Sequence, residues 1–361
     1  MTSNVSRRNF IKGAAVAGVA AASAGRWRWA DADEPLKVAV YGGVFKDVLD
    51  KVLFKPFQKD TGIAVESKPE PTGSVMFVQL SNAVPAGQAP VDVAIIKVTE
   101  TIKGIRSGLW MPYDESAIGN LKYVEKPFFE RHNGKLYAVS ALAWYINLVY
   151  NTQYIKSNPT SWTAFWDKQY RGDLALLSLP GNSYLLDITA HAVMKDPDLL
   201  NSRKGVKKLL DKLAEVKPNV ALWYKDEATF ESALQSGNVP MGQLYNDVTQ
   251  VMIDKGAPAK SVFPDEGPVI DRGNWVILKT TKKAKQAMAF INYACQPHVQ
   301  AAISKNLYTI PSVQHQYVKM EPSLAKRVLG PGPEHAILPN YKLYLDQADW
   351  LQDQWNKTLV G

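Results

Sequence analysis

The chain has 361 residues, of which 46% are hydrophobic and 21% are charged, and its formal net charge is +8. This composition is typical of globular proteins and the length suggests two domains or one large one, so disordered, collagen-like and multi-span membrane classes are excluded. The single cysteine, Cys295, excludes an intramolecular disulfide and an all-cysteine zinc or iron–sulfur site within one chain. None of the five histidines lies within four residues of another, which excludes an HxxxH zinc helix.

The N-terminal segment resembles a twin-arginine export signal. Residues 6–12, Ser-Arg-Arg-Asn-Phe-Ile-Lys, match the pattern S-R-R-x-F-[LI]-K, and the mildly apolar stretch 13–24 that follows is too short for a permanent membrane span. A-x-A cleavage sites end at Ala24 and at Ala32, and the second predicts that residues 1–32 are removed. Their removal lowers the net charge from +8 to +4. We therefore expect the Tat translocase to deliver the mature chain to the periplasm.

The mature chain alternates between strand-like and helix-like segments. Short apolar or β-branched runs predict strands at 36–41, 63–65, 91–96, 174–177, 240–244 and 275–278. Apolar positions at helical spacing predict helices at 44–61, 76–83, 184–194, 202–216, 227–236 and 283–294. Strand–helix alternation of this kind indicates an α/β fold with an open sheet that contains parallel strands.

Several segments together, in a constant order, resemble extracellular solute-binding proteins, and most specifically the spermidine/putrescine-binding subunits of ATP-driven importers. The first strand runs into Tyr41-Gly42-Gly43, and residues 54–63 are similar to the family's "F…TG-I-V" opening. Residues 161–172 are similar to "SW-x-x-LWD…Y-x-G", and residues 234–246 with 263–267 to "L-x-S-G-E-V…WN…W-P-x-E-G". Residues 287–293 complete the set. The resemblance runs from about Leu36 to about Ser312.

The resemblance implies the type II periplasmic binding protein fold, in which two α/β lobes hold a ligand in the cleft between them. The chain would cross between the lobes twice, near Ala143 and Asn274, at a hinge. Lobe one would comprise residues 33–143 and 276–326, and lobe two residues 144–275. The C-terminal segment, 327–361, would pack back on the lobes, with a helix from Pro339 to Val360.

The family's ligand-binding positions carry over residue by residue. Polyamine binders end their first strand in a W-x-x-Y pair, and here Gly42 and Phe45 occupy those places, so one aromatic wall persists. The tryptophan of their "WN" element is Tyr245 here, whose alternative role is that of a core aromatic, and Asn246 is kept. The remaining predicted ligand-binding residues are Gly43, Lys97, Trp144, Tyr145, Ser183, Asp271 and Trp275.

Departures from the family pattern concern the charge of the ligand. The acidic D-x-x-E element of polyamine binders is replaced by residues 180–184, Pro-Gly-Asn-Ser-Tyr, which leaves Asp271 as the one candidate carboxylate. Lys97 stands where relatives have a serine, and a desolvated lysine beside a dication is unfavourable. Lys97 and Arg272 therefore suggest a ligand with a negative group. Alternatively, Lys97 is a solvated loop lysine or pairs internally with Asp271 or Asp247.

These observations predict the substrate-binding subunit of an ATP-driven importer, which captures a small polyamine-like or other amine solute and delivers it to the ABC permease of the inner membrane. One alternative is the same role for an anionic or zwitterionic solute, such as an amino acid derivative, a phosphonate or a carboxylate. A remote alternative is a secreted enzyme, but the chain has no G-x-S-x-G elbow and no G-x-G-x-x-G loop. We expect no catalytic residues, metal, cofactor or nucleic-acid partner, and a monomer.

Overall fold

The computed structural model describes residues 34–70 and 75–360, so the predicted signal peptide lies outside the described residues. Within these residues, ten strands form one continuous sheet whose main path runs β2-β1-β3-β10-β5-β8-β6-β7. The strands are β1 (Leu36–Tyr41), β2 (Val65–Glu70), β3 (Val93–Lys97), β4 (Phe129–His132), β5 (Lys135–Asn151), β6 (Leu174–Leu177), β7 (Val220–Tyr224), β8 (Met241–Tyr245), β9 (Ala259–Val262) and β10 (Val269–Ile277).

The helices cover both ends of this sheet. The first seven along the chain are α1 (Val44–Leu49), α2 (Lys55–Thr61), α3 (Val75–Ala83), α4 (Val98–Arg106), α5 (Pro180–Ser183), α6 (Leu185–Ile188) and α7 (Arg203–Ala214). The next seven are α8 (Glu227–Ser236), α9 (Asn246–Asp254), α10 (Ala284–Ala294), α11 (Pro297–Leu307), α12 (Pro322–Val328), α13 (Tyr341–Asp346) and α14 (Ala348–Trp355). No helix among residues 34–70 and 75–360 combines the length and apolar character needed to cross a bilayer.

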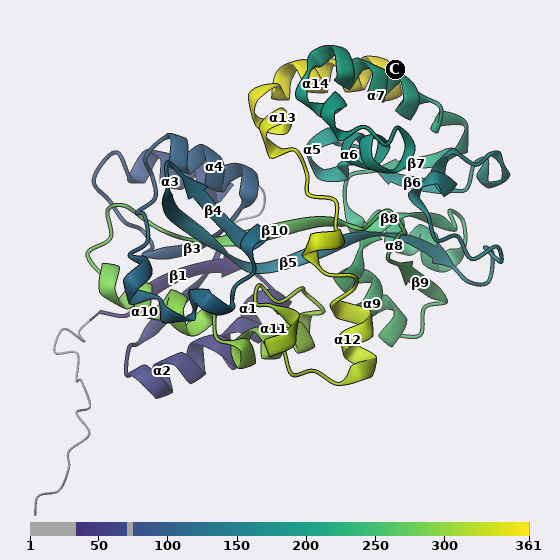
Figure 1. Cartoon of the computed structure of the whole chain (residues 1–361). Helices are drawn as coiled ribbons and strands as arrows, with labels where there is room; N and C mark the ends of the chain where they lie inside the picture. The colour runs from purple at the N-terminus through teal and green to yellow at the C-terminus, as the bar shows by residue number, and fades with distance from the viewer. Residues whose placement is uncertain (1–33, 71–74, 361) are drawn as a thin grey trace, which may run out of the picture.

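Two lobes stand side by side in Figure 1, joined by β5 and β10. In lobe one, β1 pairs in parallel with β2 and β3, and apolar side chains are buried on both faces of the strands. In lobe two, β6 pairs in parallel with β7 and β8, again between two buried clusters. Parallel strands buried on both faces are typical of α/β domains. The predicted two-lobe α/β fold is confirmed.

Strands β5 and β10 are antiparallel to each other and belong to both lobes. Along them the buried residues change from one core to the other between Tyr145 and Ile146 and between Val269 and Ile270. The predicted crossings, near Ala143 and Asn274, lie on the same two strands.

A third passage between the lobes follows Ala336. Ile337 belongs to the core of lobe two, and its backbone pairs with β10 beside Val269. The C-terminal segment then forms α13 and α14, which pack on lobe two (Figure 1). A buried carboxylate holds this tail in place, because Asp187 accepts hydrogen bonds from the Asn340 backbone N–H and from the Tyr344 hydroxyl.

Several predicted elements differ from those of the structure. The strands at 36–41 and 174–177 and the helix at 227–236 are confirmed with the same bounds. The second strand begins at Val65, where the predicted one ends, and β10 begins at Val269, six residues before the predicted strand. The 17-residue strand β5 has no counterpart among the predicted strands.

Candidate functional site

The strand ends of both lobes meet at the cleft. Tyr41 ends β1, Lys97 ends β3 and Tyr245 ends β8, and a helix begins within three residues of each. In open α/β sheets, ligand sites form outside the carboxyl ends of parallel strands, because loops and helix N-termini converge there. The sheet topology therefore brings residues that are far apart in sequence to one place.

The pairing register decides which side chains of β5 and β10, the two hinge strands that join the lobes, point toward these strand ends. Asp271 of β10 lies directly opposite Trp144 of β5, and Gly273 lies opposite Lys97. Tyr245 lies opposite Ile146, two residues beyond Trp144. Directly paired residues, and residues two apart along a strand, share a face of a sheet. Asp271, Lys97, Trp144 and Tyr245 consequently lie on the same face.

A pocket of about 230 Å³ occupies this face between the lobes, and we call it the cleft pocket. Lobe one, the hinge strands and lobe two all contribute to it. Its lining residues are Tyr41, Phe45, Lys97, Trp144, Glu227, Tyr245, Asp247, Val248 and Asp271.

Three aromatic rings form one wall of the cleft pocket. The ring of Tyr41 lies 6.1 Å from that of Phe45 and 6.0 Å from that of Trp144, measured between centroids, and the Phe45 and Trp144 rings are 6.2 Å apart. Tyr245, which is partly buried, lines the same pocket from lobe two. Ring faces attract ammonium groups, by ~0.5 to 2 kcal/mol each depending on desolvation.

Three carboxylates and one ammonium group line the cleft pocket. Asp247 and Asp271 are each 7% exposed, whereas Glu227 is exposed at the start of α8. Burial raises the pKa of Asp247 to about 7, and burial also raises the pKa of Asp271, against the opposing charge of Lys97. The pKa of Glu227 is raised in the same way. Such shifts mean that burial outweighs the favourable interactions of these carboxylates, and no positive side chain lowers the pKa of Asp247.

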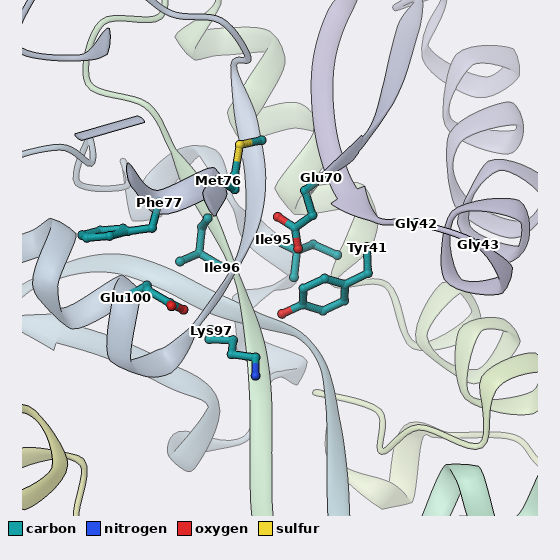
Figure 2. Close-up of a pocket in the computed structure, with 10 residues that line it drawn as sticks. All are labelled: Tyr41, Gly42, Gly43, Glu70, Met76, Phe77, Ile95, Ile96, Lys97 and Glu100. Atoms are coloured by element: carbon teal, nitrogen blue, oxygen red, sulfur yellow. The ribbon is translucent and has the colours of Figure 1, made fainter. Parts of the chain in front are cut away.

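A second pocket of about 440 Å³ continues from the cleft pocket into lobe one, and we call it the annex. The two share Tyr41 and Lys97. Figure 2 shows the carboxylates of Glu70 and Glu100 in the annex, with the Tyr41 ring and Lys97 beside them. Burial raises the pKa of Glu70 to about 8 and also raises that of Glu100. The other lining residues are Gly42, Gly43, Met76, Phe77, Ile95 and Ile96.

Glycines make room at two points of the site. Gly43 has φ +61° immediately before α1, a left-handed conformation that glycine adopts at little cost. At Gly273 a Cβ atom would lie 2.7 Å from Ile95 Cγ2 and 2.8 Å from the Tyr41 hydroxyl oxygen. The absence of a side chain on β10 therefore lets the Tyr41 ring lie across the strand.

Seven of the eleven predicted site residues line the two pockets: Gly42, Gly43, Phe45, Lys97, Trp144, Tyr245 and Asp271. Lys97 is exposed and lies in both.

The other four predicted residues line neither pocket, because each is used in packing. Tyr145 is buried and its hydroxyl donates to the Leu329 carbonyl at 3.0 Å, while Trp275 packs against Phe290 with ring centroids 5.1 Å apart. The Ser183 hydroxyl is buried beside the Pro180 carbonyl. The Asn246 amide donates to the Arg327 carbonyl at 2.9 Å and accepts from Ser261 and Gln250.

Two expectations about charge are wrong. Arg272 does not line either pocket, because it follows Asp271 on the strand and points to the opposite face, where its guanidinium donates to Glu130. Asp271 is also not the one carboxylate of the site, since Glu227 and Asp247 line the cleft pocket with it. Each of these two acids lies a few residues after the end of a strand, in the first turn of the helix that follows. That position is the sequence signal by which they could have been found.

Residues 52–323 match the family model described as bacterial extracellular solute-binding protein, and residues 4–24 match that of the twin-arginine translocation pathway signal sequence. The gamma-aminobutyric acid-binding protein of Pseudomonas aeruginosa is 26% identical over 332 residues, 90% of each chain. Spermidine/putrescine-binding periplasmic protein 1 of Haemophilus influenzae is 26% identical over 264 residues, 70% of this chain and 69% of that one.

Solved structures give the same fold. The crystal structure of an ABC transporter substrate-binding protein from Bradyrhizobium japonicum matches with a TM-score of 0.77 at 21% identity, covering 90% of this chain and 99% of that one. Among residues 34–70 and 75–360, no group of three or more His, Cys, Asp or Glu side chains is placed to hold a metal ion.

Proposed function

Because the chain belongs to the bacterial extracellular solute-binding proteins and carries a twin-arginine signal, we propose that it is the periplasmic substrate-binding subunit of an ATP-driven importer and that its ligand is a small organic amine. It is a binding protein and not an enzyme. The observation that carries the ligand class is the lining of the cleft pocket, where three carboxylates and four aromatic rings face a single ammonium group, that of Lys97.

The charges favour a cation. Asp247 and Asp271 are buried and their pKa values are raised mainly by burial, so a positive ligand would restore the interactions that they lack. The rings of Phe45, Trp144 and Tyr245 provide faces for an ammonium group or an alkyl chain. An anion without an amine would meet more negative than positive charge here.

Two kinds of amine fit this description, and Lys97 distinguishes them. A diamine would place its ammonium groups among the carboxylates and leave Lys97 solvated. An ω-amino acid would place its ammonium there and its carboxylate against Lys97, which lies between the cleft pocket and the annex. Relatives of both kinds exist, since one is named for gamma-aminobutyric acid and another for spermidine and putrescine.

Closure of the lobes follows from the origin of the contacts. Phe45 and Lys97 belong to lobe one, Trp144 and Asp271 to the hinge strands, and Tyr245 to lobe two. Contacts with all of them together exist only when the lobes are closed, so ligand binding shifts the equilibrium toward the closed state. The closed, loaded protein would then deliver its ligand to the permease of the inner membrane. One chain supplies the whole pocket, which supports action as a monomer.

A thermal-shift panel on the mature protein tests the ligand class, because a ligand that binds only the native state raises the melting temperature. The panel contains putrescine, spermidine, 4-aminobutyrate, succinate and an alkyl phosphonate. We expect at least one of the amines to raise the melting temperature and the two anions without an amine to leave it unchanged. Stabilisation by succinate or the phosphonate alone would contradict an amine ligand.

A further inference from the structure

Asp247 is a buried carboxylate without a charged partner in the described part of the chain. It lies in the first turn of α9, directly after Tyr245 and Asn246, and is 7% exposed. Its Oδ1 atom has no hydrogen-bond partner among the described residues, and no ion pair there involves it. A buried carboxylate of this kind needs either a proton or a cation. It faces the cleft pocket, where a cation could reach it.

The charged groups around Asp247 are mostly of its own sign. Glu227 and Glu231 approach it from α8, and Asp271 lines the same pocket from β10. The one cation lining that pocket, Lys97, comes from the end of β3 and acts on Asp271 and Glu227. Backbone N–H groups at the start of α9 favour the ionised form of Asp247, so the carboxylate is ready to stay charged once a cation arrives.

We infer that Asp247 is the counter-ion of the ligand's ammonium group and that it releases a proton to solvent when the ammonium enters the cleft pocket. The inference rests on the proposed amine ligand. In this step the carboxyl O–H bond of Asp247 breaks, the proton goes to the buffer, and the carboxylate forms an ion pair with the incoming ammonium. No covalent bond to the ligand is formed.

The direction of the pH dependence follows from the protonation of the empty site. Burial raises the pKa of Asp247 to about 7, so the empty site is mostly protonated below this pH and mostly ionised above it. Since the ammonium binds the ionised form, the affinity falls as the pH is lowered through about 7. For one fully coupled proton, the affinity falls about tenfold for each pH unit below that value.

The test is isothermal titration calorimetry of the mature protein with putrescine and with 4-aminobutyrate, from pH 5.5 to pH 8.5. Each titration is repeated in two buffers that differ in ionisation enthalpy, which measures the number of protons released. We expect the unmodified protein to release a fraction of a proton at pH 7 and more at pH 6. An amine that binds with no proton exchange across this range would overturn the inference and leave the proposed function intact.

The variant Asp247→Asn assigns the proton to this residue, with Glu231→Gln as its matched control. Glu231, which belongs to α8, lies near Asp247 but does not line either pocket. We expect Asp247→Asn to bind amines at least tenfold more weakly than the unmodified protein at pH 8. On binding at pH 6 it should release a smaller fraction of a proton than the unmodified protein does. By pH 5.5 the difference in affinity between the two proteins should be mostly gone. Glu231→Gln should stay within about threefold of the unmodified protein throughout.

Other outcomes decide against the inference. Proton release and affinity in Asp247→Asn equal to those of the unmodified protein would place the counter-ion elsewhere in the pocket. Absence of binding of either amine to the unmodified protein at every pH would overturn both the inference and the proposed function. The pH series on the unmodified protein stands even if the variant fails to fold.

Discussion

Asp271 on β10 lies directly opposite Trp144 on β5, so a buried carboxylate and a partly buried indole share the cleft face of the hinge. Both residues sit on the two strands that the lobes share. A ligand that touches them contacts the part of the molecule where the lobes bend. We therefore expect substitutions on the cleft face of these two strands to affect ligand affinity and lobe closure together.

Gly273→Ala tests the packing of the hinge against the aromatic wall. The new Cβ atom would lie 2.7 Å from Ile95 Cγ2 and 2.8 Å from the Tyr41 hydroxyl oxygen, so the Tyr41 ring must move toward the pocket. Overpacking of this kind costs ~1 to 3 kcal/mol of stability. We expect a lower midpoint in urea unfolding and weaker amine binding. Gly119→Ala is the control, because nothing lies within 4 Å of a Cβ atom there.

Tyr245→Ala tests the aromatic wall of lobe two. Removing the ring should weaken amine binding by roughly 1 to 3 kcal/mol, measured by calorimetry, while unfolding remains cooperative. Tyr145→Phe is the matched control, since it removes only the hydroxyl that donates to the Leu329 carbonyl and should lower stability by ~1 kcal/mol without changing affinity. If Tyr245→Ala changes stability alone, Tyr245 acts in packing and does not contact the ligand.

Site residues are best predicted from the sequence where the position of the residue depends only on the strand or helix that carries it. Phe45, Lys97 and Tyr245 flank predicted strand ends, and all three line the cleft pocket. Asp247 and Glu227 stand at helix starts after strand ends, as ligand-binding residues often do, but their presence in the cleft pocket also depends on how lobe two sits against lobe one. The expectation that Arg272 meets the ligand is wrong because neighbouring residues on a strand point to opposite faces, and Asp271 takes the cleft face.

The fold is likewise predictable where local patterns are strong. Short apolar or β-branched runs indicate β1 and β6 with their observed bounds. The start of β10 is hard to predict as a strand because it contains the polar run Asp271-Arg272-Gly273-Asn274. This segment is a strand because it pairs with β3 and β5. Such pairing, between segments more than a hundred residues apart, overrides local propensity.

Arg272→Met tests the assignment of Arg272 to the hinge rather than to the ligand. The guanidinium and the Glu130 carboxylate form a largely buried ion pair, with side chains 9% and 14% exposed. Breaking a buried pair from one side costs ~3 to 5 kcal/mol, so the free energy of unfolding should fall by about that much. Arg131→Met breaks an exposed pair with Glu115 and should cost at most ~1 kcal/mol. Amine affinity should be unchanged in both variants. A loss of affinity in Arg272→Met alone would mean that Arg272 contacts the ligand.

Export depends on the twin arginines. Replacing Arg7 and Arg8 with lysine should leave the precursor in the cytoplasm, because the signal is read through the arginine pair. Cell fractionation followed by immunoblotting measures the distribution. Replacing Arg26 and Arg28 with lysine in the same way is the control, since these residues follow the matched segment 4–24 and should permit normal export. Periplasmic protein after the Arg7 and Arg8 change would exclude this route.

Lys97→Ala decides which kind of amine the protein carries. Lys97 is exposed, lines both the cleft pocket and the annex, and stands within reach of any negative group that a ligand brings into the cleft. For 4-aminobutyrate, loss of the lysine ammonium should weaken binding at least tenfold, about 1.4 kcal/mol. For putrescine the same substitution removes a like charge beside the ligand, so affinity should stay constant or improve. Lys103→Ala, on the exposed face of α4 and outside both pockets, controls for the general loss of one positive charge. Equal effects of the two substitutions on both ligands would mean that Lys97 does not contact the ligand, and the choice between a diamine and an ω-amino acid would then depend on the carboxylates alone.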